Sequence, residues 1–357
     1  MRTSLFVVAG VALVAACADE ATAPSPVDEQ PTTATALEVT SDSWLTLANM
    51  PANRTGPAVV TVTDAAAQSI VYTIGGLSPT RMPSAKVTAY DVATNTWTFR
   101  RPLPRALAGS SGAGVIDGKI YVSGGYSDWG GDFPEGSLYM YDPATNTWTR
   151  KSDIPRVDGP GGDHYYGLGD GVTGVIKKNL YVVSGCFMAY DPWGYIDGCS
   201  PLFFRYNPAT DRWVALPRPF QNLPMVGPSI GGVIAGKFYV MGRSPYTSEA
   251  RFAVYDPVTN AWTSRTPLGL GRPGAASAVL DGKLYVMGGR RYNAKTDAMD
   301  TLDITIVYDP ATDAWTRRAS LPGPRTGLAA SRVYLNGKPR IELVGGSAPG
   351  NNLQYVP

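Results

Sequence analysis

The chain has one histidine and three cysteines among its 357 residues, which leaves few side chains for metal binding or nucleophilic catalysis. No His or Cys cluster has the spacing of a zinc site, and no glycine-rich strand-to-helix element has the pattern of a nucleotide-binding loop. Charge is also scarce, because only 17% of the residues are charged and the net charge is +2. We therefore expect no metal, no cofactor and no nucleic-acid partner.

The N-terminus has an apolar run, Leu5 to Ala16, that follows Arg2 and is too short to span a bilayer as a mature helix. The run ends Val14-Ala-Ala-Cys17, which resembles the lipobox of bacterial lipoproteins, whose cysteine is lipidated and becomes the mature N-terminus. The resemblance implies a signal peptide over residues 1–17 and lipidation at Cys17. The protein would then be exported and anchored in the bacterial cell envelope, at the outer membrane or on the periplasmic or cell-surface side. An ordinary cleaved secretion signal is the alternative.

Residues 18–41 are rich in Ala, Thr, Pro and acids, which is the composition of a disordered tether. The other two cysteines, Cys186 and Cys199, are close in sequence, and an exported chain permits a disulfide between them. Closing so short a loop would stabilise the fold by about 3 kcal/mol in the chain-entropy model. Two buried thiols are the alternative.

Glycine, proline and a repeated aromatic motif are abundant, with 40 Gly and 30 Pro. The stretch Tyr141-Asp-Pro-Ala-Thr-Asn-Thr-Trp148 recurs at residues 90–97, 206–213, 255–262 and 308–315. Its Asp or Asn and, in most copies, Pro predict a tight turn between two strands. In most units a glycine-containing two-residue turn, such as Asp117-Gly-Lys119, precedes an apolar strand. Paired glycines end that strand at residues 75–76, 124–125, 288–289 and 345–346.

Paired glycines followed by Tyr-Asp-Pro and Trp at fixed spacing resemble the kelch repeat. The resemblance covers residues 44–357 and implies an all-β, six-bladed kelch-type β-propeller over residues 42–357, with one four-stranded blade per repeat. Cys186 and Arg243 replace the second glycine in the third and fourth units. The last unit ends at Pro357 without a Trp strand, and residues 43–48 contain one. An N-terminal strand is therefore predicted to complete the last blade.

Kelch propellers also resemble the central domain of galactose oxidase. That copper chemistry needs two histidine ligands, so a single histidine excludes it for this chain.

Antiparallel strands place the connections from strand 2 to strand 3, and from strand 4 to the next strand 1, on one face, which we call the long-loop face. Long variable loops on a rigid scaffold usually carry function. The third unit has the longest inserts, which include Tyr165, Tyr166 and Trp193. These aromatics suit stacking on sugar rings, or they form a small core under the loops. His164 is either a local hydrogen-bonding residue or a catalytic one.

Arginine occurs near the predicted start of strand 1 in five of the six units, at Arg54, Arg105, Arg156, Arg272 and Arg325, whereas the fourth unit has Met225. Strand 1 lines the channel of a propeller, so these guanidinium groups could form a positive ring that binds a carboxylate or phosphate. Alternatively, they pair with carbonyls or acids of neighbouring blades.

The sequence favours a non-enzymatic binding module of the cell envelope that recognises a glycan or a protein with its long-loop face. The alternative is a mutarotase acting on an acidic sugar, because a sialic acid mutarotase of the bacterial periplasm shares the six-bladed kelch form. Ring opening needs a proton acceptor and a donor. Glu135 and Glu249 are the glutamates in the long loops, and Arg251 is near Glu249.

Overall fold

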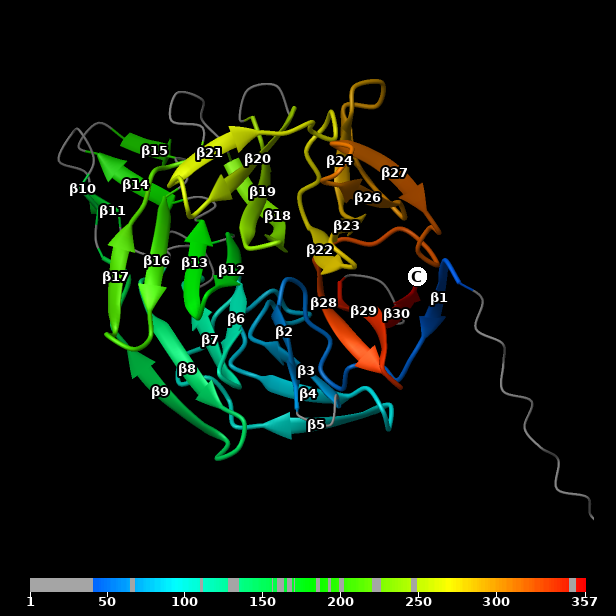
Figure 1. The fold of residues 1–357 in the computed structure, drawn as a ribbon, viewed down its shortest axis with the longest axis horizontal. Coiled ribbons are helices and arrows are strands. Elements are labelled where there is room, and N and C mark those ends of the chain that lie inside the picture. Colours follow the sequence, from blue (N-terminus) through cyan, green and yellow to red (C-terminus); the bar gives the residue numbers. More distant parts are fainter. Residues whose placement is uncertain are drawn as a thin grey trace, which may run out of the picture. The chain divides into compact units, whose positions relative to one another are not determined.

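The computed structural model describes residues 41–64, 68–109, 112–127, 135–155, 157–158, 164–165, 169, 171–183, 187–191, 194–198, 202–219, 226–244, 249–346 and 351–357. Every named element within these ranges is a β-strand, and six four-stranded antiparallel sheets are arranged around a central axis (Figure 1). This confirms the predicted six-bladed all-β propeller. No helix in the described ranges is long and apolar enough to cross a membrane.

Each blade is one sheet, and its first strand is the innermost. Blade 1 consists of β2 (Ala58–Thr63), β3 (Ser69–Ile74), β4 (Val87–Asp91) and β5 (Thr96–Arg100). Blade 2 consists of β6 (Ala113–Ile116), β7 (Lys119–Ser123), β8 (Leu138–Asp142) and β9 (Thr147–Lys151). Blade 3 consists of β12 (Val172–Ile176), β13 (Asn179–Val183), β16 (Phe203–Asn207) and β17 (Arg212–Ala215). Blade 4 consists of β18 (Val226–Ile234), β19 (Lys237–Arg243), β20 (Ala250–Asp256) and β21 (Ala261–Ser264). Blade 5 consists of β22 (Ala275–Leu280), β23 (Lys283–Gly288), β26 (Thr305–Asp309) and β27 (Ala314–Arg318). Blade 6 consists of β28 (Leu328–Leu335), β29 (Lys338–Gly345), β30 (Asn352–Val356) and β1 (Ser43–Thr46).

Within the described ranges, three two-stranded hairpins are inserted between blade strands. Two belong to the third unit, where β10 (Val157–Asp158) pairs with β11 (His164–Tyr165), and β14 (Phe187–Asp191) pairs with β15 (Gly194–Gly198). The third, β24 (Arg290–Asn293) with β25 (Ala298–Thr301), connects strands 2 and 3 of blade 5. These hairpins are the long inserts that the sequence places on the long-loop face.

Local turn chemistry explains why the strands end where they do. In the Tyr-Asp-Pro turns the Asp or Asn side chain accepts a backbone N–H two residues later, as Asp309 does from Ala311 at 2.9 Å. The two-residue turns between strands 1 and 2 have positive φ at both positions, as at Asp281 (49°) and Gly282 (71°). This is the geometry that a tight hairpin requires, and it confirms the predicted turns.

The paired glycines allow a close approach between adjacent blades. The second glycine of blade 1, Gly76, donates its N–H to the carbonyl of Leu107, in the connection that enters blade 2, at 2.9 Å. A Cβ atom on Gly75 would lie 2.4 Å from that same carbonyl oxygen. Any side chain at this position would therefore push the two blades apart.

A repeated set of hydrogen bonds, which we call the inter-blade latch, joins the outer strands of neighbouring blades. Each outer-strand Trp donates its indole N–H, at 2.7–3.0 Å, to the carbonyl of the residue four positions after the Trp of the preceding blade. The pairs are Trp97–Ala48, Trp148–Arg101, Trp213–Ser152, Trp262–Pro217, Trp315–Thr266 and Trp44–Ala319. Each repeat thus carries a donor, its Trp, and four residues later an acceptor for the Trp of the next repeat, so the repeated sequence also specifies the contacts between blades.

An Asn or Asp two residues before each Trp completes the latch. Its side-chain oxygen accepts the hydroxyl of the Tyr in strand 3 at 2.5–2.8 Å, in all six blades. In five of the six latches it also accepts the backbone N–H of the residue whose carbonyl binds the Trp. The exception is the latch at Pro217, because proline has no N–H to donate. All six Asn or Asp residues have φ between 51° and 55°, a conformation these residue types tolerate.

The ring closes within blade 6 with the same latch. β1 pairs with β30, with Trp44 opposite Tyr355 and their ring centroids 5.2 Å apart. Asp42 supplies the latch oxygen, accepting the Tyr355 hydroxyl at 2.7 Å and the Ala319 N–H at 3.0 Å. The predicted completion of the last blade by an N-terminal strand is therefore confirmed.

Aromatic contacts fill five of the six interfaces between blades. A Tyr in strand 2 of each of the first five blades packs against the strand 3 Tyr of the next blade, with ring centroids 5.5–6.1 Å apart; the pairs are Tyr72–Tyr141, Tyr121–Tyr206, Tyr181–Tyr255, Tyr239–Tyr308 and Tyr285–Tyr355. The strand pairing gives Glu342 the equivalent position in blade 6. This carboxyl is completely buried. At this position, one interface of the ring therefore has a carboxyl group where the other five have a tyrosine.

Candidate functional site

The connections before strand 1 and after strand 2 lie together on one face of the ring. Isolated backbone bridges join them, as between Thr55 and Leu77, Ser84 and Leu107, and Ala108 and Tyr126. Around blades 1 and 2, the connections of the long-loop face are therefore joined to one another. Two hollows open among these connections, one on the axis and one to its side.

The axial pocket has a volume of about 440 Å³ and is lined by residues at the start of five inner strands and by Gly231 from the middle of β18. Its wall consists mostly of Gly, Ala, Val and Pro, with the hydroxyl-bearing side chains of Thr173 and Ser277. Around its rim, Gly56 donates its N–H to the Gly327 carbonyl at 2.8 Å, and Gly327 donates to Gly274 at 2.9 Å. No charged side chain lines this pocket among the described residues, so its wall is backbone and small side chains rather than a ring of guanidinium groups.

Arg54 lies inside the fold at the blade 1 end of this region, and only 2% of it is exposed. Its guanidinium donates to the hydroxyls of Thr73 and Thr88 at 2.7 and 2.8 Å and to the carbonyl of Gly75 at 3.0 Å. Burial lowers the pKa of Arg54 to about 10. Its donors are directed at the ends of strands 2 and 3 of its own blade, and not at the carbonyls or acids of a neighbouring blade that the sequence analysis gave as the alternative to a binding role.

Arg272 and Arg325 occupy the same position as Arg54 in blades 5 and 6, because each precedes an axial-rim glycine by two residues. Arg325 is 6% exposed, and burial lowers its pKa. Burial also lowers the pKa of Arg272 to about 10, and the positive charges of Arg291 and Arg317 act in the same direction. Within the described ranges, the buried Nη1 of Arg272 has no hydrogen-bond partner.

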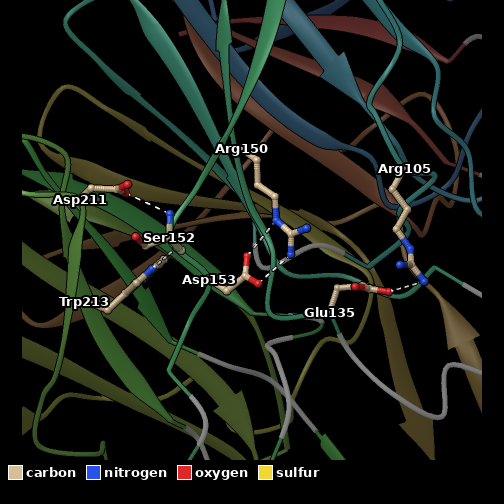
Figure 2. A network of polar contacts seen from close by, with 7 residues as sticks. All are labelled: Arg105, Glu135, Arg150, Ser152, Asp153, Asp211 and Trp213. Atoms are coloured by element: carbon tan, nitrogen blue, oxygen red, sulfur yellow. Dashed lines mark hydrogen bonds and ion pairs between the residues drawn. The ribbon is translucent and has the colours of Figure 1, made fainter.

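Arg105 does not belong to this set, because Leu107 has the equivalent place in blade 2. Arg105 is exposed and forms an ion pair with Glu135 at 2.9 Å (Figure 2). The Ser127 hydroxyl accepts a hydrogen bond from Arg105 and donates one to Glu135. The pair joins the connection entering blade 2 to the connection before its third strand. The Arg105 side chain is 56% exposed, so the attraction is largely screened by water.

The other contacts in Figure 2 have a structural role. Arg150 pairs with Asp153 at 2.7 Å on the surface of blade 2. Ser152 lies between Asp211 and Trp213 and is bonded to both through its backbone, as one of the six inter-blade latches. The latch at Ser152 therefore belongs to the framework that holds blades 2 and 3 together.

Glu249, the other glutamate in the long loops, is exposed and has no ion pair with Arg251. Its backbone bridges Leu270 in the connection to blade 5. Neither Glu135 nor Glu249 is among the described residues that line the two hollows. The described part of the chain also contains no group of three or more His, Cys, Asp or Glu that could hold a metal ion.

Several predicted site residues lie outside the described residues; they are Cys17, Arg156, Tyr166, Cys186, Trp193 and Cys199. His164 and Tyr165 are described in their backbone alone, as strand β11, which pairs with Val157 and Asp158. Next to the two cysteines in sequence, Phe187 and Gly198 are directly paired across the β14–β15 hairpin.

The second hollow, which we call the side groove, has a volume of about 910 Å³ and extends over blades 5, 6 and 1. Its lining comes from residues 53–55, Leu77 to Pro79 and Arg81, Pro273 and Gly274, Arg290 and Met299, Thr326 and Gly327, and Gly346. Blade 6 has the short connection 346–351 between strands 2 and 3, whereas blade 5 has the β24–β25 hairpin there. The side groove therefore opens beside a long hairpin, over a blade that has a short loop.

Sequence reasoning did not find Arg81, Arg290 or Met299 as site residues. They come from connections of different length in blades 1 and 5, and no repeat position relates them. The one signal in the sequence was the contrast in length between the connections after strand 2.

Comparisons with known proteins agree with this architecture. The family model described as "Kelch motif" matches residues 109–155 and 271–322. Kelch-like protein terF of Aspergillus terreus is 28% identical over 77% of this chain and 58% of its own length. Kelch-like protein 25 of Xenopus tropicalis is 26% identical over 71% of this chain and 39% of its own length.

Kelch repeat and BTB domain-containing protein 1 of camelpox virus is 25% identical over 70% of this chain and 40% of its own length. The alignments thus span between 39% and 58% of these three relatives. Among solved structures, YjhT has a TM-score of 0.65 at 15% identity, covering 87% of this chain and 95% of that one, which is a likeness of fold. The chain thus contains matches to the kelch motif and is similar to kelch-like proteins, in agreement with the ring of six four-stranded blades.

Proposed function

We propose that this protein is a binding module that recognises a macromolecular partner with its long-loop face, at the side groove. The observation that carries the proposal is the groove itself, which at about 910 Å³ is large enough to seat several residues of a partner. Exposed Arg81, Arg290 and Met299 lie along it. Arg and Met are enriched in protein–protein interfaces, so these side chains suit a protein partner.

A protein partner fits the groove better than a glycan does. Sugar rings are commonly held by stacking on aromatic side chains, and no aromatic residue lines the groove among the described residues. The aromatics that favour a glycan in the sequence are Tyr165, Tyr166 and Trp193, whose side chains are outside the described part. A mutarotase has less support than either, because neither Glu135 nor Glu249 is among the described residues that line the axial pocket or the side groove.

Site-specific photo-crosslinking tests the binding function. With p-benzoyl-phenylalanine in place of Met299, which is 44% exposed in the groove, irradiated cells should yield a covalent adduct with a partner. The matched control is the same replacement at Val258, which is 83% exposed in a strand 3–4 turn on the opposite face. Protease digestion of the adduct distinguishes a polypeptide from a glycan. Equal adducts at both positions, or none at position 299, would contradict a partner site in the groove.

We also propose that the propeller acts at the bacterial cell envelope, anchored by a lipid on Cys17, as the lipobox-like ending of the N-terminal apolar run suggests. Cells grown with an alkyne fatty acid should label the full-length protein, and Cys17→Ser should abolish the label and release the protein from the membrane fraction. Cys186→Ser serves as the control and should keep both properties. Persistent labelling of Cys17→Ser would remove the lipoprotein assignment and leave an ordinary secretion signal.

A further inference from the structure

The side groove has a one-sided charge. Arg81 and Arg290 both line it and both are exposed, and no Asp or Glu is among its described lining residues. Neither guanidinium has an acidic partner within ion-pair distance in the described part of the chain. This distinguishes them from Arg105, which is neutralised by Glu135, and from Arg54, whose donors are used inside the fold.

Both cations are attached to backbone that is held in place. Arg81 belongs to a small loop in which its N–H bonds to the Ser78 carbonyl at 2.8 Å and Ser78 donates to the Met82 carbonyl at 2.9 Å. The φ of Arg81 is 60°, fixed by that loop. On the other blade, Arg290 donates its backbone N–H to the Pro273 carbonyl at 2.9 Å and begins the β24–β25 hairpin. A charge on ordered backbone loses less freedom when it binds, so less of the binding free energy is spent on ordering it.

Apolar surface accompanies the two charges. Met299, Leu77 and the prolines 79 and 273 contribute it within the same lining. An unbranched thioether adapts its shape to varied aliphatic partners. The groove therefore presents two guanidinium groups together with an aliphatic surface.

From this combination we infer that the occupant of the side groove is an acidic polypeptide segment, with Asp or Glu side chains paired to Arg81 and Arg290 and an aliphatic side chain against Met299. The charge complementarity selects carboxylates, which guanidinium binds by paired hydrogen bonds. The aliphatic lining selects a peptide over an acidic sugar. This inference rests on the proposed function and names the partner chemistry of the same groove.

Selection from a random dodecapeptide phage library on the immobilised full-length protein tests it. The enriched peptides should be acidic and should contain Leu, Ile or Val. Their binding should weaken at least tenfold in Arg81→Asn/Arg290→Gln, where Asn suits the positive φ of residue 81. Lys338→Gln is the matched control, at an exposed cation that begins β29 directly after the strand 1–2 turn of blade 6 on the opposite face, and should change affinity less than twofold.

Peptides without acidic enrichment, undiminished binding to the double variant, or no selectable peptide would each overturn the inference. Photo-crosslinking from position 299 separates this failure from failure of the binding function. If the adduct forms and its yield is the same in the double variant, the groove binds a partner that is not acidic. If no adduct forms, the proposed function itself is wrong.

Discussion

Removing residues 42–47 should lower the melting temperature by roughly 10–20 °C or prevent folding. The deletion takes away β1, which leaves β30 as an open edge and exposes the face of Tyr355. It also removes the only latch that joins the two ends of the described chain, formed by Asp42 and Trp44 with Ala319 and Tyr355. Loss of a packed Trp alone costs about 3–5 kcal/mol, and each kcal/mol shifts the melting temperature by about 2–4 °C in domains of roughly 150–250 residues.

Thermal unfolding followed by circular dichroism measures the effect. Removing residues 32–37 instead shortens the chain equally and leaves every latch residue in place, so it should melt like the full-length protein. The point variant Trp44→Phe should give an intermediate loss, because it keeps an aromatic ring against Tyr355 but cannot donate to Ala319. A 42–47 deletion that melts with the full-length chain would show that closure by β1 contributes nothing to stability.

Raising the pH from 5 to 8.5 should destabilise the protein, and Glu342→Gln should remove most of that slope. Burial raises the pKa of Glu342 from 4.5 to about 8; its bond from Gln354 and the charge of Arg340 oppose the rise without cancelling it. Between pH 4.5 and about pH 8, Glu342 keeps its proton in the folded protein and releases it in the unfolded chain. The free energy of unfolding therefore falls with pH, from full stabilisation below pH 4.5 until Glu342 has ionised above pH 8.

The whole shift corresponds to a loss of about 5 kcal/mol from this one group. Urea unfolding at pH 5, 6, 7, 8 and 9 gives the slope directly. The glutamine variant retains an oxygen that can accept from Gln354 and carries no charge, so it should be several kcal/mol more stable than the wild type at pH 9 and similar at pH 5. Glu249→Gln, at an exposed glutamate, should leave the wild-type slope unchanged. Parallel slopes for wild type and Glu342→Gln would mean that the carboxyl ionises inside the fold at little cost.

The place of Glu342 in its repeat is visible in the sequence, although its burial is not. Its position corresponds to Tyr72 of blade 1 and Tyr285 of blade 5, so aligning the six second strands would have identified the exception. The sequence could not show that this position faces the next blade and excludes water. Its raised pKa is a property of the assembled interface.

The arginines near the start of strand 1 illustrate the same limit at the site. Arg54 and Arg105 are both close to a strand 1 in sequence, at ten and eight residues after a Trp. The two-residue difference sends one inward, to Thr73 and Thr88, and leaves the other on the surface beside Glu135. The spacing of the repeats predicts the course of the backbone, but it does not predict whether a loop side chain points into the fold or toward solvent.

The sequence by itself determined the number of blades, the turns that bound their strands and the completion of the last blade by residues near Trp44. These follow from local rules, since Asx, Pro and Gly fix the turns and a fixed Tyr–Trp spacing sets the register of each repeat. Only the tertiary structure brought Arg81, Arg290 and Met299 into one groove and buried Glu342 between blades 6 and 1. The groove and the buried carboxyl both depend on which segments, far apart in the chain, become neighbours when the ring closes. No local sequence pattern specifies these contacts.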